Sequence, residues 1–79
     1  MIKLGAFGLS TNPTTDLIVE DNKSIKQIAM DQGITINTDI VTHNGSPLAP
    51  ALLLKPISEL GVEDGDLIFI TVKRDGANN

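Results

Sequence analysis

Apolar and polar positions alternate in the first part of the chain, and this alternation predicts two strands. Residues 2–9 read Ile-Lys-Leu-Gly-Ala-Phe-Gly-Leu, and residues 14–20 read Thr-Thr-Asp-Leu-Ile-Val-Glu. The segment between them contains Asn12-Pro13, and both residue types favour a reversal of the chain. Two such strands across a short polar turn predict a β-hairpin.

The pattern then changes to the period of a helix. Ser24 and Gln27 have the spacing of a capping box, which supplies hydrogen-bond partners to free N–H groups at a helix start. Gly33 is expected to end the helix in the left-handed conformation. The apolar stripe at positions i, i+3 and i+4 is about two turns long and consists of Ile25, Ile28 and Ala29. One short helix is therefore predicted.

The rest of the chain is predicted to hold two more main strands separated by an irregular flap. In chain order, the expected elements are a strand over 39–43, a turn at Asn44-Gly45, a flap over 46–56 with a short edge strand near Leu48, a helical turn over 57–60, a strand over 66–73 and a flexible polar tail over 75–79. A single helix must cover one face of one mixed sheet. The first and last strands are expected side by side in its middle, because helical crossovers favour parallel neighbours.

Length and composition bound the class of protein. The chain has 79 residues, 41% of them apolar and 20% charged, which suits one small acidic globular domain with a net charge of −4. It has no cysteine, which excludes a disulfide framework, a zinc–thiolate site and a thiol nucleophile. The six basic residues are scattered and only two residues are aromatic, so nucleic-acid binding is not expected. With neither a signal-peptide pattern nor an apolar run of about 20 residues, a soluble cytoplasmic protein without membrane contact is expected.

Several local sequences in this order resemble the ubiquitin-like β-grasp superfamily over residues 1–74. They are Val19-Glu20 before the capped helix, Gly33-Ile34 after it, Asn44-Gly45 after the third strand, and Ile57-Ser58-Glu59-Leu60-Gly61-Val62 followed by Asp64-Gly65-Asp66. The resemblance implies an α+β fold, a β-grasp roll with a mixed sheet of four to five strands packed on one short helix. It implies residues 1–74 as the domain and 75–79 as a tail.

The tail departs from that superfamily. Ubiquitin-like modifiers and the sulfur carriers related to them end in Gly-Gly, and the terminal carboxylate is adenylated. Here Gly76 stands alone, between Asp75 and Ala77. A modifier or sulfur carrier activated at a C-terminus trimmed to Gly76 is therefore an alternative, and a small accessory subunit of a multi-component enzyme is another.

No pattern in the sequence predicts catalysis, a metal or a cofactor. His43 is the only histidine, and no spacing brings a serine and an acid to it as a catalytic triad requires. Glu63, Asp64 and Asp66 flank Gly65 but lack the twelve-residue pattern of a calcium loop. We expect a protein that is not an enzyme and binds no cofactor.

The last strand is apolar on both faces, and this feature suggests a function. The resemblance implies that Leu67 and Phe69 face the helix, so that Ile68, Ile70 and Val72 point away from it. By alternation, the outer face would also carry Ile40, Thr42, Phe7 and Ile18, with Leu53 of the flap contributing.

Two interpretations of that outer face remain open. It binds a protein partner or a second copy of the chain, because contiguous exposed apolar patches usually mark interfaces. Alternatively, the flap at Leu52–Leu54 folds over it as an internal lid. The function expected is a non-catalytic ubiquitin-like protein-interaction module.

Overall fold

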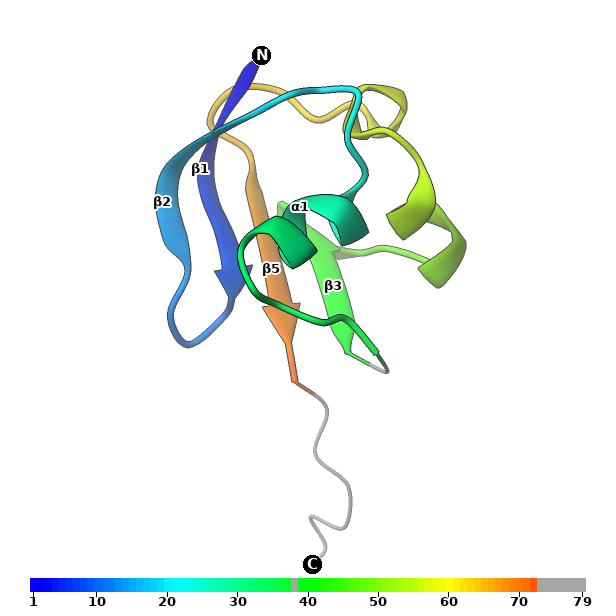
Figure 1. The fold of residues 1–79 in the computed structure, drawn as a ribbon. Helices are drawn as coiled ribbons and strands as arrows, with labels where there is room; N and C mark the ends of the chain where they lie inside the picture. The colour runs from blue at the N-terminus through cyan, green and yellow to red at the C-terminus, as the bar shows by residue number, and fades with distance from the viewer. Residues whose placement is uncertain (38, 73–79) are drawn as a thin grey trace, which may run out of the picture.

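The computed structural model describes residues 1–37 and 39–72. The predicted tail over 75–79, with Gly76, and the predicted end of the last strand at Lys73 lie outside the described residues. The elements are β1 (Ile2–Leu9), β2 (Thr14–Val19), α1 (Ile25–Asp31), β3 (Ile40–His43), β4 (Ser46–Pro47), the 3-10 helices η1 (Pro50–Leu54) and η2 (Ile57–Leu60), and β5 (Leu67–Thr71) (Figure 1).

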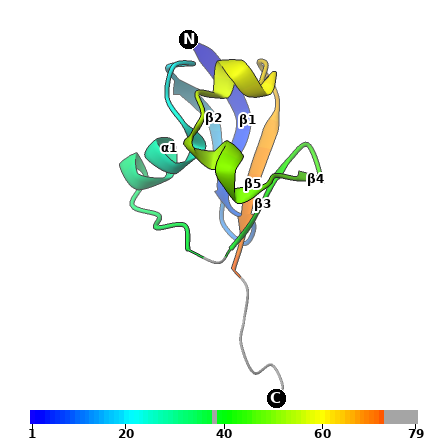
Figure 2. The ribbon, with the colours of Figure 1, turned by 90° about the vertical axis from the view of Figure 1, so that its right-hand side faces the viewer.

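The strands form one mixed sheet in the order β2-β1-β5-β3-β4. β1 and β5 run parallel in its middle, with Phe7 beside Ile68, as the crossover rule predicted. The other neighbouring pairs are antiparallel, and Val41 of β3 lies beside Ile70 of β5. In the described part of the chain, the protein is thus a small α+β domain with a five-stranded mixed sheet and one α-helix, which lies on one side of the sheet (Figures 1 and 2).

The helix begins and ends where its sequence predicts, although the capping box is only half formed because the Gln27 side chain bonds to Asp31. Ser24 is the N-cap, and its Oγ accepts a hydrogen bond of 3.1 Å from the Gln27 N–H. Gly33 has φ of 79°, and the next residue, Ile34, donates its N–H to the carbonyl of Ala29 at 2.8 Å. These two features complete a glycine-terminated C-cap and turn the chain back toward the core.

The core lies between the sheet and the helix. Among the described residues, the buried cluster comprises Leu4, Phe7, Val19, Ile25, Ile28, Ala29, Val41, Leu53, Ile57, Val62, Ile68 and Ile70. Leu53 comes from η1, so one leucine of the flap packs into this cluster while the next, Leu54, is exposed. The flap therefore contributes to the helix side of the sheet, and the prediction that Leu53 belongs to an outer surface is wrong.

The regular alternation of β1 is interrupted near its middle. Leu4 and Phe7 are both fully buried in the core, although they are three residues apart. Opposite this point in β2, Asp16 has φ of 54°, which an ordinary strand residue does not adopt. The change of phase brings Phe7 inward, so its predicted place on the outer face is wrong. Gly5 also lies here, and a Cβ on it would come within 2.6 Å of the Gly65 carbonyl oxygen.

The orientation of β5 is opposite to the one that the resemblance implies. Ile68 and Ile70 are 0% and 1% exposed and belong to the core, whereas Leu67 is 40% exposed and Phe69 is half-buried. Because side chains alternate along a strand, an error of one residue exchanges its two faces completely. The predictions that Ile68 and Ile70 lie on the outer face, and that Leu67 and Phe69 lie in the core, are therefore wrong.

Truncating neighbouring residues of β5 should show this orientation in solution. Ile68→Ala should lower the free energy of unfolding by about 2–4 kcal/mol, because it leaves a cavity in the core. Leu67→Ala should lower it by less than about 1 kcal/mol, because the side chain is already partly in water. Urea unfolding of both variants measures the difference, and a larger loss for Leu67→Ala would contradict the orientation described.

Candidate functional site

The residues predicted for protein interaction fall into two groups. Ile68, Ile70 and Leu53 are buried in the core, so a partner cannot reach them in the folded protein. Ile40 and Val72 are 50% and 57% exposed, and Val72 follows the last residue of β5. Thr42, the sixth predicted residue, belongs with this second group because it is half-buried on the sheet.

The side of the sheet away from α1 carries a different apolar surface. Thr42 lies beside Phe69 across the β3–β5 ladder, and Ile40 lies beside Thr71. These positions alternate with core residues, so they face away from the helix, as does Leu67. In the structure the outer face therefore consists of Ile40, Thr42, Leu67 and Phe69, and the term is used for this set from here on.

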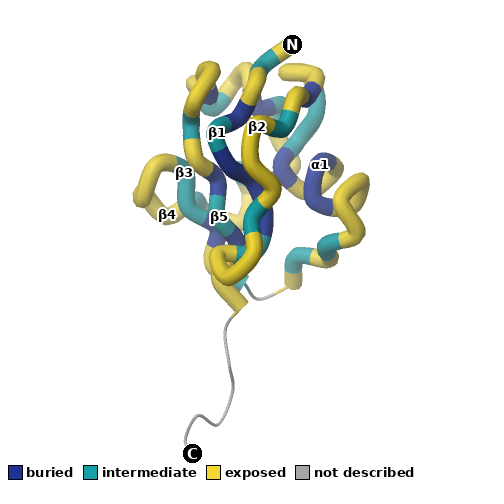
Figure 3. Tube along the Cα trace, turned by 90° about the vertical axis from the view of Figure 1, so that its left-hand side faces the viewer, coloured by how far each residue is buried: buried dark blue, intermediate teal, exposed yellow. Residues whose placement is uncertain are grey.

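The outer face continues toward β1 and β2. Leu67 is paired with Ala6 of the parallel neighbour β1, and its Cδ2 atom lies 3.1 Å from the position that a Cβ on Gly5 would take. The Leu67 side chain therefore rests directly on the backbone of β1. Ile18 of β2, 60% exposed and paired with Lys3, lies at the margin. Figure 3 shows that β2 is exposed along most of its length.

Sequence reasoning missed Leu67 and Phe69 as surface residues, although a signal for them is present. Thr71 and Lys73 share their parity in the sequence, and polar residues at alternate positions indicate the face toward water. Ile68 and Ile70 share the parity of only one polar residue, Asp66, which lies at the start of the strand. Alternation within the last strand alone therefore favours the orientation found.

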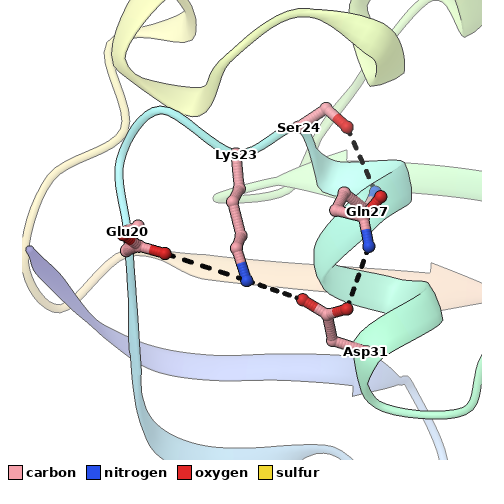
Figure 4. Close-up of polar contacts among 5 residues, drawn as sticks. All are labelled: Glu20, Lys23, Ser24, Gln27 and Asp31. Atoms are coloured by element: carbon pink, nitrogen blue, oxygen red, sulfur yellow. Dashed lines mark hydrogen bonds and ion pairs between the residues drawn. The ribbon is translucent and has the colours of Figure 1, made fainter.

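A polar cluster lies between β2 and α1 (Figure 4). We interpret its contacts as support for the end of the helix and not as a reactive site. Lys23 Nζ lies 2.9 Å from Asp31 Oδ2 and 3.9 Å from Glu20 Oε1, and Gln27 Nε2 donates to Asp31 Oδ1 at 2.9 Å. The hydrogen bond to Asp31 raises the pKa of Lys23, and those from Lys23 and then Gln27 lower the pKa of Asp31. Asp31 stands in the last helical turn, where the helix dipole disfavours an anion, so Lys23 offsets that effect. Exposed ion pairs of this kind contribute little to stability.

An open groove runs beside this cluster. It has a volume of about 240 Å³ and is lined by apolar side chains of Met1, Leu17 and Ile28 together with charged ones, including Lys23 and Asp31. Within the described residues, His, Asp and Glu side chains form no group of three or more that could hold a metal ion. No helix in this part of the chain is both long and apolar enough to cross a membrane.

The second polar cluster joins the end of β3 to the start of β5. His43 Nε2 donates to Asp66 Oδ2 at 2.7 Å, and both side chains are less than one fifth exposed. Asn44 N–H donates to the Leu67 carbonyl at 2.7 Å, and Leu67 N–H donates to Asn44 Oδ1 at 2.8 Å. We call these three contacts the clasp. They hold the strand start from which Leu67 projects onto the outer face.

Asp66 is the ionised centre of the clasp. The hydrogen bond from His43, followed by those from the Glu63 N–H and from Asn44, holds the pKa of the Asp66 carboxyl below its ordinary value. A lowered folded-state pKa stabilises the protein at a pH above the ordinary value, and that contribution is lost as the pH falls through the folded-state pKa.

The variant Asp66→Asn tests this contribution. At neutral pH it should lower the free energy of unfolding by about 1 kcal/mol, because it removes a charged acceptor of hydrogen bonds. Urea unfolding of wild type and variant from about pH 6 to about pH 2 should show the difference shrinking as Asp66 becomes protonated. A difference that stays constant down to the lowest pH would mean that the charge of Asp66 does not matter.

Comparison with known proteins adds no relative to this description. No protein-family model, no curated protein and no solved structure matches the chain. The outer face, the groove and the clasp are therefore interpreted from their own geometry.

Proposed function

We propose that this chain is a ubiquitin-like β-grasp domain that works as a non-catalytic docking module, and that its outer face binds a protein partner. The order of elements supports the β-grasp assignment. A hairpin, a crossing helix and a final strand parallel to the first give the sheet order β2-β1-β5-β3-β4. The residues that resemble the superfamily in sequence occupy the corresponding turns, such as Asn44-Gly45 after β3.

The observation that carries the docking function is the exposure of aliphatic side chains on the sheet. Ile40 and Leu67 are 50% and 40% exposed, and the Thr42–Phe69 pair lies between them. In a small water-soluble domain, an apolar patch that continues across adjacent strands usually marks an interface. Phe69 adds an aromatic side chain, a type that is enriched in interface cores.

The form of this patch favours a protein as the ligand. The patch lies on the face of a sheet, and Leu67 packs against the β1 backbone at Gly5. The surface is therefore comparatively flat. Small molecules are usually bound in concave pockets, whereas protein partners meet broad and comparatively flat surfaces. Ile40 and Leu67 are already about half covered, so burying the rest contributes about 1 kcal/mol each before the costs of association. The partner must therefore supply a complementary apolar surface with a polar rim.

The test compares two double variants, each of which replaces two exposed apolar residues with glutamine. Ile40→Gln/Leu67→Gln changes the outer face, and Met30→Gln/Leu54→Gln changes side chains that are 57% and 66% exposed on α1 and η1. Each protein is immobilised and exposed to an extract of its native cells, and the retained proteins are quantified by mass spectrometry. A partner purified from this screen is then titrated against all three proteins by calorimetry.

The outer-face variant should bind the partner about ten-fold or more weakly, the effect of losing about 1.4 kcal/mol of contact energy. The control variant should bind like the wild type. Equal affinity of the outer-face variant and wild type would reject the proposal. Sedimentation equilibrium tests self-association as the alternative, because a dimer through this face would dissociate in the outer-face variant alone.

A further inference from the structure

The turn between β3 and β4 combines a reactive sequence with an unusual backbone. His43 pairs directly with Ser46, so Asn44-Gly45 forms a two-residue hairpin loop. Asn44 has φ of 51° and Gly45 has φ of 87°, which matches the type of turn that favours Asn-Gly. Both residues are exposed, so water reaches them.

Asn-Gly sequences undergo an intramolecular reaction that needs no enzyme. The main-chain nitrogen of Gly45 would attack Cγ of Asn44, forming an N–Cγ bond while the Cγ–Nδ2 bond breaks and ammonia leaves. Water then opens the resulting succinimide at either carbonyl and gives aspartate or isoaspartate. Nothing lies within 4 Å of the position that a Cβ on Gly45 would take, so the loop is open to solvent at this residue.

The clasp opposes this reaction in the folded protein. Asn44 Oδ1 accepts the Leu67 N–H at 2.8 Å, and the Asn44 N–H donates to the Leu67 carbonyl at 2.7 Å. These bonds fix both the main chain and the side chain of Asn44 against β5. The side chain must leave Leu67 before Cγ can turn toward the Gly45 nitrogen, so local opening of the clasp has to precede the attack.

We propose that Asn44 is a site of spontaneous deamidation and isomerisation, that the clasp controls its rate, and that the isoaspartate product keeps the clasp open. Isoaspartate inserts one additional carbon into the main chain at residue 44. In isoaspartate, Cγ of residue 44 becomes part of the main chain and is bonded to the Gly45 nitrogen. Its oxygen can then stay at the Leu67 N–H only if the loop that returns to Ser46 is displaced. The inference does not depend on what the outer face binds.

The aspartate product has a different effect. Its carboxylate still accepts the Leu67 N–H, but it stands beside the carboxylate of Asp66 and lacks the amide group. The Asn44 side chain is one of the groups that stabilise ionised Asp66. Asn44→Asp should therefore retain the bond to Leu67 and raise the pKa of Asp66, because two like charges then face each other.

The first experiment measures the rate at Asn44 by peptide mass spectrometry after incubation at mildly alkaline pH. The samples are the folded wild type, the wild type in urea, His43→Gln and Lys23→Gln. His43→Gln weakens the clasp, whereas Lys23→Gln removes the exposed ion pair with Asp31 and leaves the clasp intact. Deamidation at Asn44 should be several-fold slower in the folded wild type than in urea, faster in His43→Gln, and unchanged in Lys23→Gln.

The second experiment examines the product. The isoaspartate form is separated by ion exchange, and amide hydrogen exchange is followed by NMR. The Leu67 amide should exchange several-fold faster than in the wild type or in Asn44→Asp, because its acceptor is lost. The Gly5 amide, which donates to the Asp66 carbonyl at 2.9 Å from the other side of β5, serves as the internal control and should change little.

Three results would overturn the inference. They are an Asn44 that stays unmodified in urea, equal rates in the folded and unfolded wild type, and a Leu67 amide in the isoaspartate form that exchanges as slowly as in the wild type. The comparison in urea keeps the experiment decisive even if His43→Gln fails to fold.

Discussion

The burial of Ile68 and Ile70 beneath the helix is the interaction on which the rest of this domain depends. β5 is the central strand, and it pairs with β1 on one side and with β3 on the other. Its two isoleucines meet Phe7 and Val41 across these pairs, so one buried strip connects three strands. Each isoleucine contributes about 1.5–3 kcal/mol of burial energy, a large part of the stability of a chain of this size. Ile25, Ile28 and Ala29 of the short helix belong to the same buried cluster as this strip.

The same strand also determines the surface. A strand that is apolar on both faces cannot hide both of them beneath a single seven-residue helix. With Ile68 and Ile70 inside, Leu67 and Phe69 must face outward, where Ile40 and Thr42 extend the same surface. The outer face, which we propose as the docking surface, is in this sense the complement of the core, because one alternation generates both of them.

Local sequence signals were sufficient to place the elements, but they did not determine the orientation of the last strand. Ser24 and Gly33 act within a few residues along the chain, and the helix begins and ends as they predict. The inward side of β5 depends on packing against distant parts of the chain. The apolar run from Leu67 to Ile70 carries little information about it, and the only local signal comes from Thr71 and Lys73 at the end of the predicted strand. Of the residues predicted for the outer face, Ile40 of β3 is exposed, whereas Ile68 and Ile70 of β5 are buried.

The central position of β5 also has a consequence for how the protein folds as it leaves the ribosome. Ribosomes synthesise β1 to β4 before the strand that joins them, and the pairing of Phe7 with Ile68 closes a loop of some sixty residues. Until β5 emerges, the hairpin of β1 and β2 has a free inner edge, and the helix has only part of its apolar contact surface. Such nascent chains expose hydrophobic side chains and unpaired strand edges, the features that chaperones recognise. Completion of this domain is thus a late and cooperative event, set by the moment at which its innermost strand leaves the exit tunnel.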